Sequence, residues 1–341
     1  PIILVEQARK PVIDWLFTPM SIRHQLTVNR QQLTVNRQQS TVNSIILATF
    51  SMWNHLNNLR LMSPSIPAIV KIILFFSTWI VAWLPAAIVV AIALKWHPPQ
   101  PLGNKKLPLL ASLYLIVPFI LWATTWIENT SFANWGWDWQ PEVLISLVRG
   151  LGLGIISLFI LFGLQLTAGW IELKKSENLT DIGGEKTINF WDLIFNPASL
   201  LTLLLGLWIS ATEELIFRGC LQNILQQDYS ILTAATIASF IFAIAHLIWA
   251  AKETLPQLPG LWLMGMVLTL ARIADNGSLG LAIGIHAAWI WGITTVDTAQ
   301  AIKPTSTVPE WITGIAAKPL AGAAGILLLL ATAAVVLLIK N

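Results

Sequence analysis

Charged residues are scarce in this chain. Only 11% of its 341 residues are Asp, Glu, Lys or Arg, whereas a soluble globular domain carries about 25%. So few charges cannot cover a soluble surface of this size, which argues against a soluble enzyme, a nucleic-acid binder and a disordered protein. The formal net charge of +3 is too small to imply a polyanionic partner. We therefore expect no nucleic acid among its partners.

Cysteine is almost absent as well. The single cysteine, Cys220, excludes an internal disulfide and a cysteine-based zinc site. What the chain has in abundance is apolar surface, since 55% of its residues are hydrophobic and 18 are tryptophan. Indole rings gather at the interfaces between bilayer and water. The composition therefore predicts an integral membrane protein.

Eight stretches approach the length of about 20 mainly apolar residues that a spanning helix needs. We predict an all-α polytopic membrane protein of about eight transmembrane helices that enclose an intramembrane cavity. The sixth and seventh stretches are short. The predicted spans are Ile72–Leu94, Leu107–Ile127, Val143–Trp170, Ala198–Leu225, Ile231–Ala250, Pro259–Asp275, Leu279–Thr295 and Pro319–Ile339.

The first 66 residues have a different character. The segment LTVNRQQ occupies residues 26–32, is repeated at 33–39, and begins a third time as STVN at 40–43. Its apolar positions lie two apart and lack the spacing of a coiled coil. We predict an N-terminal extension, residues 1–66, that is interfacial or partly disordered, with interfacial helices at Pro1–Met20 and Ile45–Met62. A transmembrane domain follows over residues 67–341.

Lysines in the short loops predict the orientation, because cytoplasmic loops carry an excess of Lys and Arg. The loops after the first, third, fifth and seventh spans hold all of the loop lysines, and the loops after the second, fourth and sixth hold none. We therefore expect the first set to be cytoplasmic, in a bacterial inner or internal membrane. This orientation places the Arg-bearing N-terminal segment outside, against the rule. The lysines are Lys95, Lys105, Lys106, Lys174, Lys175, Lys186, Lys252, Lys303 and Lys318.

Only eight residues inside the predicted spans can ionise. A charge at the centre of a bilayer costs about 2.5–3.5 kcal/mol on insertion scales, so such groups are candidates for function. Asp275 lies close to the end of its span. Glu213, Glu214, Arg218, His246 and His286 need a cavity or partners. The full set is Arg149, Glu213, Glu214, Arg218, His246, Arg272, Asp275 and His286.

The run ATEELIFRG at residues 211–219 holds the first cluster. Glu214 and Arg218 are four residues apart with the acid first, the better order for a helical ion pair. Glu213 is rotated about 100° from Glu214 and lacks this partner. A carboxyl group in such a site suits general acid–base chemistry. The alternative is a buried ionic network that only fixes helix contacts, since structural networks also perturb titration.

The run FIFAIAH ends at His246, four residues after Phe242. The polar stretch Gln226–Ser230 predicts an antiparallel hairpin between the fourth and fifth spans. At 1.5 Å per residue, Glu213 and His246 then lie at equal depth, about 25 Å from the turn. His286 in GSLGLAIGIHAAW differs from His246 in depth by about 10 Å for upright helices. Tilt or a recessed loop would remove that difference.

These three motifs together resemble the CPBP family of CAAX-protease and bacteriocin-processing intramembrane endopeptidases. The resemblance covers about residues 195–295 and implies a catalytic core there. It implies that Glu213 activates the attacking water, that His246 shares this water, and that His286 helps to stabilise the oxyanion. Glu214 and Arg218 would support them, with Phe242 as the second motif's aromatic residue.

The sequence departs from the family at one position. The third motif of the family has Asn four residues after its His, and here that position is Ile290. A missing oxyanion donor typically costs about 10²–10³ in rate. Trp289 and Thr294 are neighbouring candidates for a substitute donor. The departure bears on whether the site is fully active.

Three functions follow as hypotheses. The first is an endopeptidase that hydrolyses a membrane-associated protein or peptide, without a metal or with zinc on Glu213, His246 and His286, a two-His, one-carboxylate set. The motifs lack HExxH, and we favour the mechanism without metal and predict no firm cofactor. The second is a non-catalytic scaffold or immunity protein that retains a degenerate site. The third is an ion- or proton-coupled transporter. Broken helices in two related halves would favour it, but the sequence shows no such internal symmetry.

Overall fold

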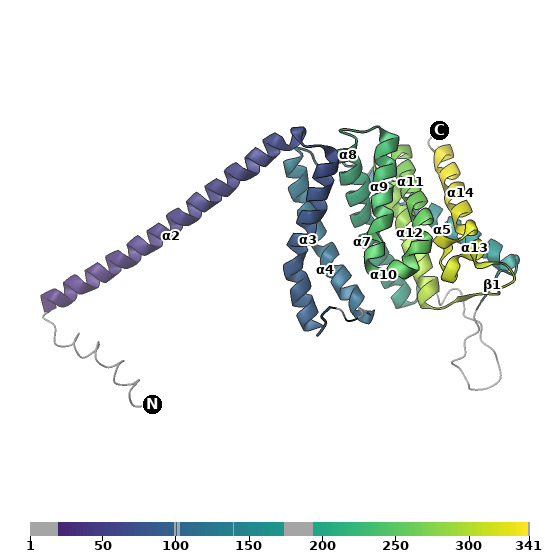
Figure 1. Ribbon diagram of the computed structural model, residues 1–341, viewed down its shortest axis with the longest axis horizontal. Coiled ribbons are helices and arrows are strands. Elements are labelled where there is room, and N and C mark those ends of the chain that lie inside the picture. The colour runs from purple at the N-terminus through teal and green to yellow at the C-terminus, as the bar shows by residue number, and fades with distance from the viewer. Residues whose placement is uncertain (1–19, 99, 101–102, 139, 174–193, 340–341) are drawn as a thin grey trace, which may run out of the picture. The chain divides into compact units, whose positions relative to one another are not determined.

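The computed structural model describes residues 20–98, 100, 103–138, 140–173 and 194–339 (Figure 1). The chain divides into two compact units, Pro1–Ser63 and Pro64–Asn341. The described part of the first unit is the 43-residue helix α2, Met20–Met62. Most of the predicted interfacial helix Pro1–Met20 lies outside the described residues.

The LTVNRQQ repeats lie within helix α2. The repeat contains no glycine or proline, and Leu, Gln and Arg are good helix formers, so nothing in it breaks a helix. Apolar side chains farther along the helix remain exposed within this unit, among them Ile46, Leu47 and Phe50. An interfacial position for Ile45–Met62 agrees with this exposure and stays a prediction.

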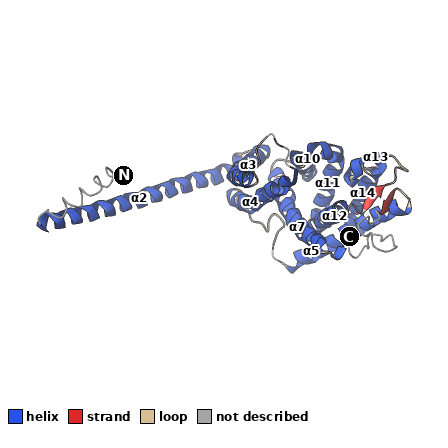
Figure 2. Cartoon of the chain, turned by 90° about the horizontal axis from the view of Figure 1, so that it is seen from below, coloured by secondary structure: helices blue, strands red, loops and turns tan. Residues whose placement is uncertain are grey.

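The second unit is a bundle of long helices, and two short strands among its described residues pair into a small sheet beside them (Figure 2). A helix lies at each of the eight predicted spans, so the all-α membrane fold is confirmed. Five helical stretches are long and apolar enough to cross a membrane: Ala68–Ala93, Lys106–Ile127, Pro141–Thr167, Pro197–Leu225 and Ala250–Ala274. The longer helices are α3 (Ala68–Ala93), α4 (Lys106–Ile127), α5 (Pro141–Thr167), α7 (Pro197–Glu214), α9 (Ile231–Ala245), α11 (Leu258–Ala274), α12 (Gly280–Thr298) and α14 (Ala323–Ile339).

Short elements connect these helices. A π-helical stretch, η3 (Leu215–Leu221), continues α7 into α8 (Gln222–Leu225). Strands β1 (Ile171–Leu173) and β2 (Ile302–Pro304) pair antiparallel, with Ile171 opposite Pro304, and follow the ends of α5 and α12. The remaining short helices are α10 (Leu247–Thr254), α13 (Glu310–Thr313), η1 (Ser63–Ser65), η2 (Gly103–Lys105), η4 (Leu255–Gln257), η5 (Ile315–Ala317) and η6 (Pro319–Ala321).

The predicted span Ile231–Ala250 is too long. Helix α9 ends at Ala245, and a separate helix, α10, begins at Leu247. The break has a local cause at His246. Its Nδ1–H donates to the carbonyl of Phe242 at 2.8 Å, the acceptor that its backbone N–H would use in a regular helix. That backbone N–H turns to Ala243 instead.

Helices α5 and α12 pack most closely, through glycines. A Cβ atom on Gly284 of α12 would lie 2.1 Å from the carbonyl oxygen of Leu147. A Cβ atom on Gly150 of α5 would lie 2.3 Å from the carbonyl oxygen of Leu281. Small residues allow membrane helices this approach. The contact fixes α12, and with it His286, against the rest of the bundle.

Candidate active site

A cavity of about 450 Å³ lies within the second unit and brings together residues from several helices. Glu213 at the end of α7, His246 after α9, and His286 of α12 all line it. Tyr114 of α4 lines it too. The rest of the lining is largely apolar and includes Phe76, Leu110, Ile209, Leu261, Met264 and Leu320. Three residues far apart in the sequence therefore line one cavity.

Glu213 is the carboxylate that faces this cavity. Its side chain is 7% exposed. The hydroxyl of Tyr114 donates a hydrogen bond to its Oε1 atom. Its Oε2 atom lies 3.6 Å from Nε2 of His286. The predicted difference in depth between His286 and His246 therefore does not keep His286 away from Glu213, the residue expected at the depth of His246.

The neighbouring acid, Glu214, faces away from the cavity into the protein. Its Oε1 atom accepts from Nη1 of Arg218 at 2.9 Å and from Nδ1 of His286 at 2.8 Å. The first of these bonds is the ion pair that the spacing of four residues predicts. All three side chains are at most 2% exposed. Opposite charge and these hydrogen bonds offset part of the cost of burying them, while Oε2 of Glu214 and Nη2 of Arg218 have no hydrogen-bond partner among the described residues.

Arg218 lies within the π-helical stretch η3. Such irregular turns are rare and often occur at functional sites. Here the stretch follows directly after Glu214, and its carbonyl at Arg218 accepts from Nη1 of Arg272 on α11. Nε of Arg272 donates to the carbonyl of Gly277 at 3.1 Å. Arg272 therefore ties two backbone segments together and does not line the cavity.

Phe242 connects the second motif to the other two. Its ring centroid lies 4.6 Å from that of His246 and 5.9 Å from that of His286. The guanidinium carbon of Arg218 lies 4.5 Å above the same ring, within the range of a cation–π contact. One buried aromatic ring thus packs against both histidines and the arginine.

His246 and Glu213 share the cavity wall, as their predicted equal depth requires. No direct hydrogen bond joins their side chains among the described residues. His246 is held instead by its Nδ1 bond to Phe242, which leaves Nε2 as the ring nitrogen free of that bond. The two side chains are therefore placed around a common space and not against each other.

Comparison with known proteins agrees with these motifs. Residues 195–292 match the family model described as Type II CAAX prenyl endopeptidase Rce1-like. This stretch is similar to the CAAX protease domain and is given that name below. The resemblance inferred from the three motifs is thus confirmed over this stretch, and with it the assignment to the proteases of this type. No significant match is found among curated proteins or among solved structures.

Tyr114 lies outside the CAAX protease domain, on α4, and the motif analysis did not identify it. Its hydroxyl donates to Glu213 from a helix almost a hundred residues earlier in the chain. A weak signal was available, because the chain has only two tyrosines and Tyr114 is the one inside a predicted span. A lone hydroxyl in an apolar helix needs a partner when it is buried.

Ile290, Thr294 and Trp289 all line the cavity of the CAAX protease domain. The indole N–H of Trp289 is not available to the cavity, because it donates to Oγ of Ser157 at 2.9 Å. Of the two candidates for a substitute donor, Thr294 therefore remains. The hydroxyl of Tyr114, which also lines the cavity, donates to Glu213.

The predicted alternative of a zinc site finds no matching geometry. Among the described residues, no three His, Cys, Asp or Glu side chains are grouped so as to hold a metal ion. Nδ1 of His286 is bonded to Glu214, and the other ring nitrogen faces Glu213 at 3.6 Å. We derive no step through a metal.

Proposed function

We propose that the chain is an intramembrane endopeptidase that hydrolyses a peptide bond of a membrane-associated protein or peptide, with Glu213 as the general base. The observation that carries the proposal is that Glu213, His246 and His286 line one cavity from three separate helices. Nucleophile activation and charge stabilisation need such convergence around the reacting atoms.

In this mechanism, Oε2 of Glu213 takes a proton from a water molecule that His246 holds from the other side. The hydroxide attacks the carbonyl carbon of the scissile bond and forms a tetrahedral oxyanion. Its collapse breaks the C–N bond, and the proton on Glu213 passes to the leaving amine. The products are a carboxylic acid and an amine, which exchange a proton to become a carboxylate and an ammonium ion, and Glu213 regains its starting state.

His286 would stabilise the oxyanion through Nε2–H. Glu214 is an acceptor only, so Nδ1–H of His286 donates to it. A second proton on Nε2 gives an imidazolium, and the four groups Glu213, Glu214, Arg218 and His286 then sum to zero charge. A preorganised donor of this kind is usually the largest single contribution to acyl-transfer catalysis.

Replacing the proposed base tests this function directly. We expect Glu213→Gln to lower the rate by about 10²–10⁴, because the amide cannot accept the proton from water. Membrane proteomics of cells whose own copy carries Glu213→Gln should reveal an uncleaved precursor. The control is Glu253→Gln, an exposed acid on α10. Unchanged cleavage in the Glu213→Gln cells would overturn the proposal.

A non-catalytic scaffold or immunity protein is the second candidate, and Ile290 favours it because that side chain donates nothing to the cavity it lines. In that case Glu213→Ala would lower thermal stability or partner binding while the wild-type protein shows no peptidase activity. An active wild-type protein that loses only hydrolysis on this substitution would exclude the scaffold.

A further inference from the structure

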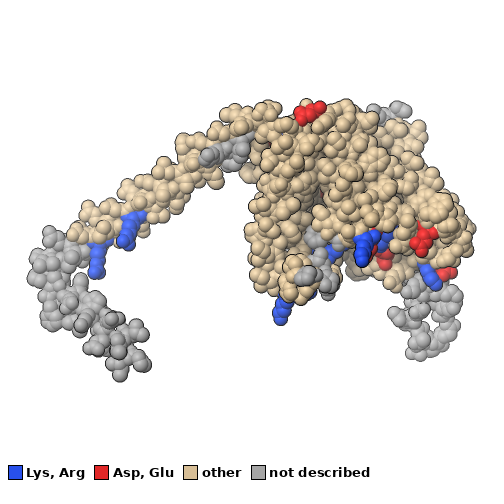
Figure 3. Space-filling view, in the orientation of Figure 1, with Lys and Arg blue, Asp and Glu red and all other residues tan. Residues whose placement is uncertain are grey.

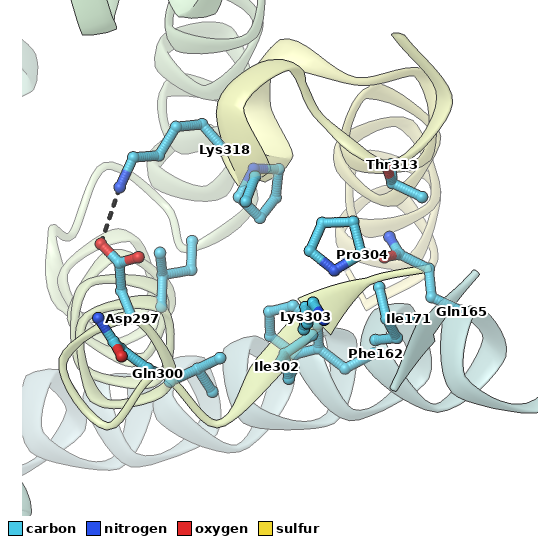
Figure 4. Close-up of a pocket in the computed structure, with 14 residues that line it drawn as sticks. Phe162, Gln165, Ile171, Asp297, Gln300, Ile302, Lys303, Pro304, Thr313 and Lys318 are labelled. Atoms are coloured by element: carbon cyan, nitrogen blue, oxygen red, sulfur yellow. Dashed lines mark hydrogen bonds and ion pairs between the residues drawn. The ribbon is translucent and has the colours of Figure 1, made fainter. Parts of the chain in front are cut away.

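A second cavity, of about 470 Å³, lies where α5 and α12 end, and the proposed hydrolysis does not use it. Figure 4 shows its lining residues as sticks, contributed by α5, α12, the two strands and the turn that precedes α14. Its polar side chains include Gln165, Lys303, Lys318 and Asp297. These polar groups stand over an apolar floor that includes Phe162, Ile293 and Pro319.

Gln165 is the first sign that this cavity receives a ligand. Its side chain is 4% exposed, and its Nε2 atom has no hydrogen-bond partner among the residues that the structure describes. Buried amides are almost always hydrogen-bonded, so each exception asks for an explanation. A ligand acceptor in the cavity would provide the missing partner.

Two lysines give the cavity its charge. Nζ of Lys318 pairs with Asp297 across the wall at 2.7 Å, as the dashed line in Figure 4 marks. Lys303 lies 3.8 Å from Glu172, and both of these side chains are more than half exposed. An ion pair so exposed is weak. Glu172 lies outside the cavity lining, so the two ammonium groups of the lining face one carboxylate of the lining, Asp297, which favours an anion there.

The cavity continues into an apolar groove along α5. The groove has a volume of about 300 Å³, and it shares Phe162, Ile171, Val296 and Ile302 with the polar cavity. It runs along the helix from Ile155 to Leu166, which is about 16 Å at 1.5 Å per residue. Phe159 and Leu166 remain exposed on its flank. The groove is therefore open to an acyl chain in the bilayer.

We propose that this pair of cavities binds an anionic phospholipid, with the headgroup against Gln165, Lys303 and Lys318 and an acyl chain in the groove beside Phe159. Charge complementarity selects the headgroup, and the shared wall makes the polar and apolar parts one amphiphilic site. The cavity lies at the end of the bundle that carries the loop lysines, where headgroups of the predicted cytoplasmic leaflet would lie. The proposal is independent of the catalytic residues.

Native mass spectrometry of the purified full-length protein tests this site, with phosphatidylglycerol and phosphatidylcholine as the two probes. We expect phosphatidylglycerol to be retained in preference. A lysine near an anionic lipid contributes about fivefold in affinity, so Lys303→Gln and Lys318→Gln should each lower retention of phosphatidylglycerol by about that factor. Gln165→Leu should lower it as well. Lys252→Gln, at an exposed position on α10, is the matched control.

Asp297→Asn supplies a test that misfolding cannot imitate. Removing the Asp297 carboxylate leaves Lys318 without its ion-pair partner. We therefore expect stronger retention of phosphatidylglycerol, with no change in the retention of phosphatidylcholine. Equal retention of the two lipids, or wild-type retention in both lysine variants, would overturn the proposal. Complete displacement of the lipid by inorganic phosphate alone, or by a peptide, would also overturn it, since the site would then recognise a free anion or a polypeptide.

Discussion

Tyr114 is the side chain through which α4 reaches the proposed base. Its hydroxyl holds Oε1 of Glu213 and leaves Oε2 directed toward His286. A hydrogen bond to a charged group contributes about 1.5–3 kcal/mol. We expect Tyr114→Phe to lower kcat by about 10- to 100-fold, with little change in KM, because the carboxylate loses its orientation. Steady-state kinetics on a cleaved substrate would measure this.

The other tyrosine provides the control for that substitution. Tyr229 lies in the turn before α9 and is 38% exposed, so Tyr229→Phe should leave both kinetic constants unchanged. A Tyr114→Phe protein with wild-type kcat would show that the bond to Glu213 does not matter for turnover. An equal fall in the thermal stability of Tyr114→Phe and in its activity would point to a structural role alone.

Sequence spacing captured those contacts that one helix makes with itself. The pair Glu214–Arg218 follows from a separation of four residues, and the structure confirms it. The bond from Tyr114 to Glu213 does not follow, because it depends on how α4 packs against α7. The meeting of Glu213 with His286 was also open from sequence, since the depth of α12 is set by its glycine contacts with α5.

At the contact between α5 and α12, we expect a single added methyl group to have a large effect on stability. A Cβ atom at Gly284 would lie 2.1 Å from backbone oxygen, which cannot yield as a flexible side chain can. Overpacking of a tight contact typically costs about 1–3 kcal/mol. We expect Gly284→Ala to lower the midpoint of thermal unfolding in detergent, and to lower activity because His286 is on the displaced helix.

Gly152 offers the matched control on α5. A Cβ atom there meets nothing within 4 Å, and alanine is the better helix former. We expect Gly152→Ala to be neutral or slightly stabilising. If the Gly284→Ala protein unfolded at the wild-type temperature, the glycine contact would not be what seats α12.

Hydropathy located the long helices of the second unit but not their irregular turns. The break at His246 arises from one side-chain hydrogen bond to Phe242, and η3 interrupts a run that is apolar on both sides of Arg218. Both features depend on individual polar contacts, which an average over about 20 residues does not detect. Both also lie next to the proposed site, and departures from regular helical geometry are most frequent at functional sites.

In Figure 3, Lys and Arg lie along the lower edge of the second unit with acidic residues beside them, and a further acidic group lies at the opposite edge. The lysines at the lower edge agree with the alternation of lysine-bearing loops in the sequence, which predicts that the lower end is cytoplasmic. The polar cavity with Lys303 and Lys318 belongs to the same end. The membrane fold follows from the composition, whereas the direction of insertion rests on these few lysines.

Cysteine labelling can test that direction, because the native Cys220 is fully buried and needs no removal. Ala133→Cys and Lys252→Cys each place a thiol at an exposed position, one in the turn after the second predicted span and the other on α10, after the fifth. In intact cells, a membrane-impermeant maleimide should label the first variant, and it should label the second only after permeabilisation. The wild-type protein should remain unlabelled throughout. The reverse pattern would invert the topology and would place the proposed lipid site in the outer leaflet, where the excess of loop lysines would then break the positive-inside rule.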